Sequence, residues 1–199
     1  MAELGKTLYD RGYVAGSAGN MSVRLENNIV LMTPSGSCMG RLDPEALSAV
    51  DPDGKLVAGP RPSKEIEFHL AIYRNDSACS AIVHLHSTWA TILSCRGDLD
   101  RENPIKPFSP YFVMKIGTLQ VIPYYPPGDP SLARDMVKWA GKRNAFLLRN
   151  HGFVVLAGTL SEAVDLAEEL EETAKLAGLM KDNEIKYLSK EEIDFLRKK

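Results

Sequence analysis

The sequence predicts an α/β fold of three layers, α/β/α, in which helices cover both faces of a central, mostly antiparallel sheet. Two observations lead to this class. Segments with helical periodicity alternate along the chain with apolar segments of strand length, and such interleaving is typical of α/β proteins. Many expected strands are short, and the first two are joined by a polar turn at 26–28, which favours antiparallel pairing. The length suits one domain, residues 1–199.

The expected strands are compact apolar runs bounded by turn residues. A turn at 16–20 precedes the first strand, and residues 51–62 are rich in turn residues, so we expect a loop or another short hairpin there. In chain order the strands are expected at 21–25, 29–33, 81–86, 119–124, 145–148 and 153–157.

The expected helices carry an apolar stripe or begin at a capping residue. Leu4 and Leu8 lie on one face of an N-terminal helix. Asp43 and Pro44 are the cap and first residue of a short helix, and Ser63 caps a stronger one. After that short helix, helices are expected at 63–75, from 87 onward, and at 129–142, 161–180 and 189–197.

Composition and charge exclude several classes of protein. The formal net charge is −2, so the chain has no bulk attraction to nucleic acid or to an anionic membrane, and we expect neither as a partner. The three cysteines, Cys38, Cys79 and Cys95, include no CxxC pair. This argues against a disulfide framework and a thiolate zinc site, and it fits a reducing cytoplasm. No apolar run reaches membrane-spanning length. We therefore expect a cytoplasmic protein in which any bound anion is held by a local site.

Three of the four histidines form a candidate metal site. His84 and His86 are two residues apart on an expected strand, so both imidazoles point to the same face. His151 lies in a turn between two apolar strands, and Gly152 would give the backbone freedom to turn its ring inward. Three protein ligands with an open position are typical of a catalytic zinc site. The spacing alone leaves open that the first two are chance neighbours at a strand end.

The fourth histidine and a nearby acid share one helix face. His69 lies in the middle of the expected helix, and the favoured interpretation is a structural histidine packed near the core edge. Glu65 lies four residues earlier, in the first helical turn, where the helix dipole favours a carboxylate. Glu65 is therefore either an ordinary N-terminal charge or a functional group. The functional roles are a fourth metal ligand that substrate displaces, or a general acid/base beside the metal.

Three short segments have the chemistry of an anion-binding nest. The first, Gly16–Asn20, offers backbone amides and two side-chain donors, and Thr33–Gly36 repeats this pattern at a strand end. Ser63 and Lys64 supply a hydroxyl, a cation and a helix N-terminus. Each segment alone is also typical of an ordinary turn or cap. None matches a P-loop or a dinucleotide-binding fingerprint.

The motifs GSAGNMS, TPSG, PSKE, HLHS and NHG occur in this order along the chain. This ordered set resembles the class II aldolase/adducin family, which includes fuculose-phosphate aldolase and ribulose-phosphate epimerase, and the resemblance covers essentially the whole chain. It implies that His84, His86 and His151 bind zinc, and that Glu65 binds zinc and shuttles a proton. It also implies that phosphate is bound by Ser17, Gly19, Asn20, Thr33, Ser35, Gly36 and Ser63.

The resemblance is strongest to one branch of this family. The stretches GSCMGRLDP, HSTWAT, FSPYFVMKIG and YYPPGD resemble 3-oxo-tetronate 4-phosphate decarboxylase. That branch implies a metal-dependent reaction that passes through an enediolate and yields dihydroxyacetone phosphate and carbon dioxide. The aldolases usually carry two small hydroxyl residues before the acid, whereas this chain has Ser63 and Lys64. The lysine could hold a second anion such as a substrate carboxylate. The alternatives are a sugar-phosphate aldolase and a non-catalytic adducin-like module.

The family also implies an assembly and a second catalytic group. Its members form cyclic homotetramers with active sites at subunit contacts, so a homotetramer is expected here. Its aldolases have a catalytic tyrosine in the loop equivalent to the one that carries Tyr111, which makes Tyr111 a candidate acid or orienting group. Tyr111 could equally be a packing residue. The expected metal is Zn²⁺, and imidazole and carboxylate ligands would also suit Mn²⁺ or Co²⁺.

Overall fold

The computed structural model describes residues 1–180 and 185–198. Across these residues, eight strands form one sheet in the order β4-β3-β2-β1-β5-β8-β7-β6. Neighbouring strands are antiparallel except β6 and β7, which are parallel. The strands are β1 Asn20–Arg24, β2 Val30–Met32, β3 Ser48–Val50, β4 Leu56–Ala58, β5 Ala81–Leu85, β6 Gln120–Ile122, β7 Ala145–Leu148 and β8 Gly152–Ala157. The mostly antiparallel sheet is therefore confirmed.

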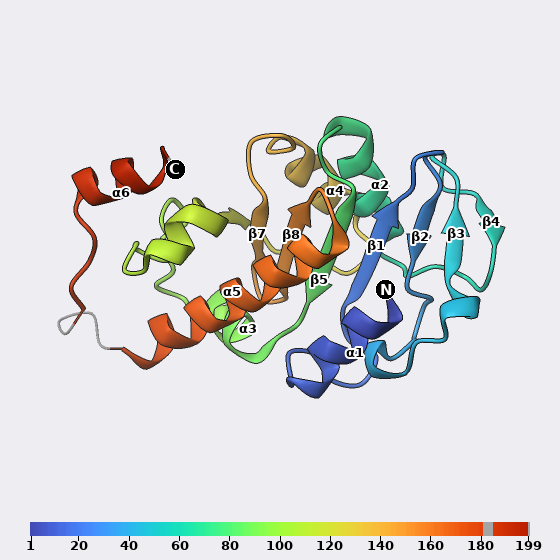
Figure 1. The fold of residues 1–199 in the computed structure, drawn as a ribbon, viewed down its shortest axis with the longest axis horizontal. Coiled ribbons are helices and arrows are strands. Elements are labelled where there is room, and N and C mark those ends of the chain that lie inside the picture. Colours follow the sequence, from blue (N-terminus) through green and yellow to red (C-terminus); the bar gives the residue numbers. More distant parts are fainter. Residues whose placement is uncertain (181–184, 199) are drawn as a thin grey trace.

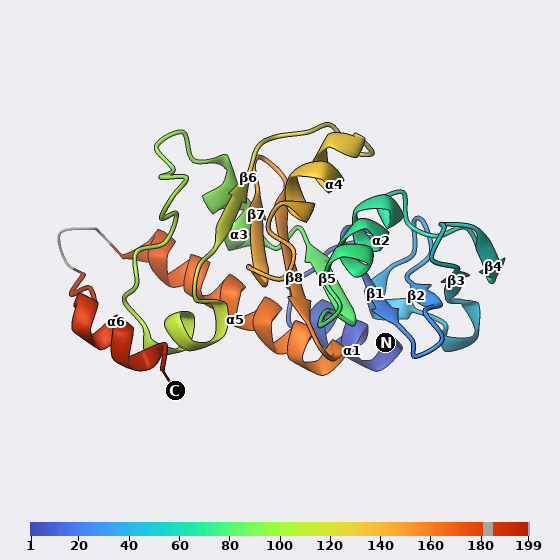
Figure 2. The same cartoon turned by 90° about the horizontal axis from the view of Figure 1, so that it is seen from above.

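Helices pack on both faces of this sheet (Figures 1 and 2). Alternate residues along β5 enter opposite cores: Val83 packs with α1, α3 and α5, whereas Ile82 packs with α2 and α4. This alternation is the period-2 geometry of a strand buried on both sides. The α-helices are α1 Ala2–Asp10, α2 Ile66–Asn75, α3 Thr88–Cys95, α4 Pro130–Val137, α5 Leu160–Leu179 and α6 Lys190–Leu196. The three-layer arrangement is confirmed.

Shorter helical turns complete the described chain. Two are 3₁₀ turns, Met39–Arg41 and Pro44–Ala46, and the second begins at the expected cap, where the Asp43 side chain accepts a bond from Glu45 N. Residues Phe112–Ile116 form a π-helix that the sequence did not predict. No helix in the described ranges combines the length and apolar character needed to cross a membrane.

Two predicted helix boundaries are wrong. The helix expected from Ser63 begins at Ile66, with Glu65 as its N-cap residue. An isolated bridge between Pro34 and Pro62, together with the Ser63 N–H that donates to Thr33 O, keeps residues 62–63 extended before the helix. The helix expected over 129–142 ends at Val137, because the chain continues in tight turns such as the one closed by Trp139 N and Met136 O.

Candidate metal centre

The strand β5 carries the first two histidines to one end of the sheet. All five of its residues are buried between β1 and β8. His84 is fully buried on this strand. His86 is the first residue after the strand and lies on the same side as His84. Leu85, between them, enters the core on the opposite face. The two imidazoles therefore share one face, as their spacing predicts.

The turn between β7 and β8 brings the third histidine alongside. Here the residue with positive φ is Asn150, at 54°, and not Gly152. The glycine is needed for close packing instead, because a Cβ at that position would lie 2.3 Å from the carbonyl oxygen of Leu85. The predicted role of Gly152 is corrected accordingly: it lets β8 approach the histidine strand, and Asn150 supplies the unusual backbone turn.

A distant carboxylate fixes the chain just after His86. Glu171 is 3% exposed on α5 and accepts hydrogen bonds from the Ser87 hydroxyl at 2.5 Å and from the backbone N–H groups of Trp89 and Ala90 at 2.9 Å. It thus satisfies the first free N–H groups of α3, where the helix dipole favours a negative charge. The start of α3 is consequently anchored to the protein core beside the histidine strand.

Four side chains converge at this end of the sheet, and we call them the ligand cluster: Glu65, His84, His86 and His151. One candidate ligand atom from each lies within 4.8 Å of all the others. The Nε2 atoms of His84 and His86 are 2.9 Å apart, and Glu65 Oε2 lies 3.3 Å from His84 Nε2. Glu65 Oε1 lies 3.7 Å from His151 Nε2. The three rings and the carboxylate therefore face a common point.

The electrostatic properties of these four side chains favour a bound cation at that point. The Nδ1 atom of His84 lies 2.7 Å from the carbonyl oxygen of Phe153, which can only accept, so Nδ1 carries a proton and Nε2 is the nitrogen that faces the cluster. Burial and neighbouring histidines lower the pKa of His86 and of His151 to about 4. Burial raises the pKa of Glu65, but His84, His151 and a hydrogen bond from Asn20 lower it, and the net pKa is below its ordinary value.

This donor set fits a divalent metal ion. It combines imidazole nitrogens with a carboxylate whose pKa is below its ordinary value, and these are the ligands of catalytic zinc sites and also of other first-row metals. Two imidazole nitrogens held 2.9 Å apart would otherwise bring two lone pairs together or require a shared proton. The predicted metal ligands are thus brought together, with Glu65 supplied from the residue just before α2.

The first two segments predicted to bind phosphate lie at the end of the sheet that carries the ligand cluster. Ser22 pairs with Met32 across β1 and β2, so the turn before β1 and the turn after β2 lie side by side. Asn20 pairs with His84 across β1 and β5. Gly19 has a φ of 70°, and a Cβ there would lie 2.6 Å from His84 O, so this position requires glycine. The first phosphate segment is therefore packed directly on the histidine strand.

The individual side chains in these segments differ in exposure. Ser17, Ser35 and Gly36 are exposed at turn tips, whereas Thr33 is buried and its hydroxyl accepts a hydrogen bond from Met21 N. The Ser63 hydroxyl accepts a hydrogen bond from Glu65 N. The neighbouring Lys64 is exposed and borders a small cavity of about 20 Å³, which is also lined by Glu65, Gly128 and Asp129.

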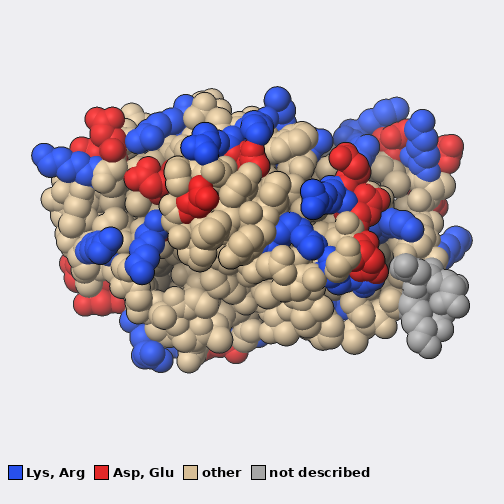
Figure 3. Space-filling model, turned by 180° about the vertical axis from the view of Figure 1, so that it is seen from behind, with Lys and Arg blue, Asp and Glu red and all other residues tan. Residues whose placement is uncertain are grey.

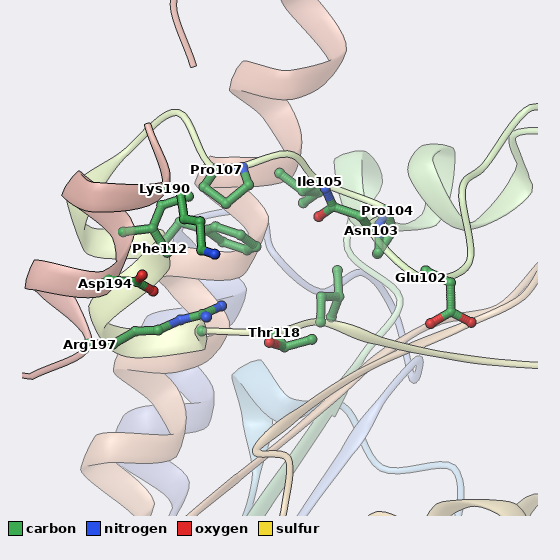
Figure 4. Close-up of a pocket in the computed structure, with 13 residues that line it drawn as sticks. Glu102, Asn103, Pro104, Ile105, Pro107, Phe112, Thr118, Lys190, Asp194 and Arg197 are labelled. Atoms are coloured by element: carbon green, nitrogen blue, oxygen red, sulfur yellow. The ribbon is translucent and has the colours of Figure 1, made fainter. Parts of the chain in front are cut away.

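Tyr111 lies apart from the ligand cluster within one chain. It precedes the π-helix and is 61% exposed. The π-helix packs against α5 and α6, and both views place it at the α6 end of the molecule (Figures 1 and 2). Beside it is a cavity of about 390 Å³, into which Lys190, Arg197 and Phe112 point (Figure 4). None of the four candidate ligands lines this cavity.

The visible charge distribution matches the small net charge. On the face drawn in Figure 3, basic and acidic side chains are interspersed, and a broad lower area has few charged residues. Neither sign forms one large patch on that face. An anionic substrate would therefore have to be recognised by local groups such as those at the sheet end.

Sequence reasoning interpreted His69 as a structural histidine and did not consider Ser22, and the structure makes both of them functional candidates. His69 has no exposed surface, and its ring nitrogens lie 2.7 Å from Ser22 Oγ and 2.7 Å from Asn20 Oδ1. The expected core-edge histidine is thus buried within a polar network. Two signals were available: the four-residue spacing from Glu65, and the two-residue spacing of Asn20 and Ser22 on one strand.

Comparison with known proteins identifies the family of the chain. Residues 1–177 match the family described as Class II Aldolase and Adducin N-terminal domain. The chain belongs to that family. Within it, the chain is 52% identical over 193 residues to a 3-oxo-tetronate 4-phosphate decarboxylase from Pectobacterium atrosepticum, covering 97% of this chain and 88% of that protein. The predicted resemblance to the decarboxylase branch of the class II aldolase and adducin family is confirmed.

Two further proteins show how similarity to the chain varies. The crystal structure of YgbL from Escherichia coli matches with a TM-score of 0.96 and 50% identity, covering 99% of this chain and 95% of that one. An L-fuculose phosphate aldolase from Methanococcus vannielii is 40% identical over 170 residues, covering 85% of this chain and 88% of that protein. The named aldolase is thus the more distant relative.

Proposed function

We propose that this protein is a carboxy-lyase that converts a 3-oxo-tetronate 4-phosphate into dihydroxyacetone phosphate and carbon dioxide. The observation that carries the proposal is the ligand cluster, in which three imidazole Nε2 atoms and one carboxylate face a common point beside the turns predicted to bind phosphate. The choice of decarboxylation over its alternatives is supported by the identity to named decarboxylases.

The balance of the reaction is simple. The bond between C1 and C2 breaks, the carboxylate leaves as carbon dioxide, and the electron pair moves toward the C3 ketone to give an enediolate. A proton then adds at C2. We propose Zn²⁺ for the ligand cluster, with Mn²⁺ or Co²⁺ as substitutes. When bound there, such an ion supplies a Lewis acid that stabilises negative charge on the ketone oxygen.

The chain's own residues would perform the remaining tasks. Glu65 is the proposed proton carrier, because its carboxylate lies at the cluster and is held by Asn20. It would take up a proton from solvent and deliver it to C2. The phosphate would be bound by the turn amides and hydroxyls of Ser17, Gly19, Asn20, Thr33, Ser35, Gly36 and Ser63. Lys64, exposed beside Glu65, would bind the substrate carboxylate as a point charge.

We further propose a cytoplasmic homotetramer. Apolar side chains with large exposed fractions, such as Met114 at 49% and Tyr124 at 57%, support a subunit contact on the half of the chain that carries Tyr111. Tyr111 would then act as an acid or orienting group in the site of another copy. The three cysteines are free, which agrees with a reducing compartment.

The second candidate function is a class II sugar-phosphate aldolase, which is favoured by the 40% identity to the named fuculose phosphate aldolase. Both reactions break a carbon–carbon bond beside a ketone and leave an enediolate, so the same cluster would serve either. The adducin-like module is disfavoured, because a non-catalytic module needs no set of converging metal ligands.

A product assay separates these functions. Purified protein loaded with Zn²⁺ is incubated with 3-oxo-tetronate 4-phosphates of both C2 configurations and, separately, with fuculose 1-phosphate. The proposal expects carbon dioxide and dihydroxyacetone phosphate in equal amounts from one tetronate. Release of an aldehyde from the sugar phosphate, without carbon dioxide from either tetronate, would assign the aldolase. Absence of both products from metal-loaded protein would favour the module.

A further inference from the structure

A buried polar chain leads from the protein core to the candidate proton carrier. Its members are joined by short contacts: Tyr73 Oη to Ser22 Oγ at 2.7 Å, Ser22 Oγ to His69 Nδ1 at 2.7 Å, His69 Nε2 to Asn20 Oδ1 at 2.7 Å, and Asn20 Nδ2 to Glu65 Oε2 at 2.6 Å. We call this set the buried chain. Its first four members are each at most 5% exposed, so the chain is shielded from bulk solvent.

The chemistry of the end members fixes the direction of every bond. An ionised carboxylate only accepts, so the Asn20 NH₂ group must face Glu65 and its Oδ1 must face His69. That oxygen also only accepts, so the His69 ring carries its proton on Nε2. Burial lowers the pKa of His69 to about 3, so the ring is neutral and Nδ1 accepts from the Ser22 hydroxyl. Tyr73 then donates to Ser22. All donors point the same way, toward Glu65.

The orientation of Asn20 therefore depends on His69. If the ring presented no N–H to Oδ1, the asparagine amide would lose the bond that distinguishes its oxygen end from its nitrogen end. The Nδ2–H bond to Glu65 Oε2 would then no longer be enforced. With the chain intact, Oε2 is held by Asn20, and Oε1 is the oxygen directed toward His151.

We propose that His69 is a positioning residue that acts through Asn20 to hold the Glu65 carboxylate in its working orientation at the ligand cluster. The proposal rests on the proposed function for its effect on turnover. It adds a task to Asn20, whose side chain was predicted only to bind phosphate. Groups that orient ligands through a second hydrogen bond commonly contribute roughly 10–100-fold to metal affinity or activity.

The first test needs neither metal nor substrate. In metal-free protein with ¹⁵N-labelled histidine, long-range proton–nitrogen correlations report which nitrogen of each ring is protonated. The four histidines are few enough to assign by comparison with single variants. The proposal expects the His69 proton on Nε2. A His69 ring protonated on Nδ1 would overturn it, because Asn20 Oδ1 would then have no donor. This result stands whether or not the protein is a decarboxylase.

The second test uses a matched pair of substitutions at His69. In His69→Gln the side-chain amide nitrogen can occupy the place of Nε2 and still donate to Asn20. In His69→Asn the shorter amide can reach only the place of Nδ1. The proposal expects His69→Asn to lose roughly 10–100-fold in kcat with little change in KM, and His69→Gln to keep most of kcat. Equal losses in the two variants would contradict it.

A third comparison separates positioning from phosphate binding and from general damage to the core. Asn20→Ala breaks the chain without altering His69, and the double variant Asn20→Ala, His69→Asn should lose no more kcat than either single variant. The visible spectrum of Co²⁺-loaded protein should change in the same variants, because it reports the ligands around the ion. Two results would refute the role of His69. The first is a loss of kcat in the double variant that equals the product of the two single losses. The second is a rise in KM alone in His69→Asn, with an unchanged inhibition constant for the product.

Discussion

The two halves of the candidate site are built on different parts of the fold. The histidine half lies on and beside β5 and β8, central strands whose residues are almost all buried. The anion half lies largely on turns, where Ser17, Ser35 and Lys64 are exposed. Core packing thus fixes the direction of the imidazoles, whereas the groups predicted to bind anions are placed by local turns. Changes in the first half should therefore affect chemistry, and changes in the second should affect binding.

The largest effect is expected in the histidine half, from His86→Ala. This variant removes one of three imidazole ligands, so metal content should fall to background and turnover should fall by more than about 100-fold. His86 follows the strand and is partly exposed, so the metal-free variant should keep its far-UV circular dichroism and most of its unfolding free energy. Metal analysis and denaturant titration check this. Full activity in the variant would remove His86 from the site.

A large loss of turnover is also expected from Glu65→Gln, which leaves the three imidazole ligands in place. The amide keeps the shape of the side chain but cannot carry a proton, so kcat should fall roughly 100- to 10,000-fold. Steady-state kinetics of the Zn²⁺-loaded variant provides the measurement, and incorporation of solvent deuterium at the hydroxymethyl carbon of the product, which was C2 of the tetronate, provides a second. Thermal unfolding is the control for the fold. An undiminished rate would exclude Glu65 as the proton carrier.

The anion half should respond differently to Lys64→Met. Loss of one charge-assisted contact should raise KM for the tetronate substrate by about 10-fold and leave kcat nearly unchanged. Inhibition by inorganic phosphate should not change, since the phosphate turns stay intact. Lys64→Arg, which preserves the charge, is the matched control. If phosphate inhibition weakened and the tetronate KM did not move, Lys64 would belong to the phosphate site.

A smaller effect is expected on the stability of the metal-free protein at low pH. The pKa of His86 and His151 is lowered from an ordinary 6.5 to about 4, so the unfolded chain binds more protons than the folded one between these values. The free energy of unfolding should therefore fall as pH is lowered from about 6.5 to about 4. Urea titrations at several pH values measure it. Metal-free His86→Ala should show a shallower decrease, and an unchanged slope would contradict the assigned cause.

The sequence predicted the parts of the site that depend on local spacing. The two-residue spacing of His84 and His86 on a buried strand correctly placed both rings on one face, and the mostly antiparallel three-layer fold followed from interleaved short elements. The boundary at Glu65 was missed, because the extended chain before it is held by a bridge to Pro34 from another part of the fold. Local sequence carries no signal for such a contact.

Other features depend on packing between distant segments. The bond between Asn20 and His69 needs β1 to lie against α2, and residue spacing alone does not reveal that register. The same holds for Gly152, which is required by the nearby Leu85 carbonyl and not by its own turn. The π-helix before Gly117 was likewise missed. The single domain over 1–199 and the substrate roles of Lys64 and Tyr111 stay predictions.

The most direct test of the central claim is a crystal structure of metal-loaded protein with anomalous diffraction data collected at the zinc edge. We expect one anomalous peak per chain, with the Nε2 atoms of His84, His86 and His151 each at about 2.0–2.1 Å. A metal bound elsewhere, or a peak that fewer than three of these rings approach, would contradict the proposed metal centre and the chemistry built on it.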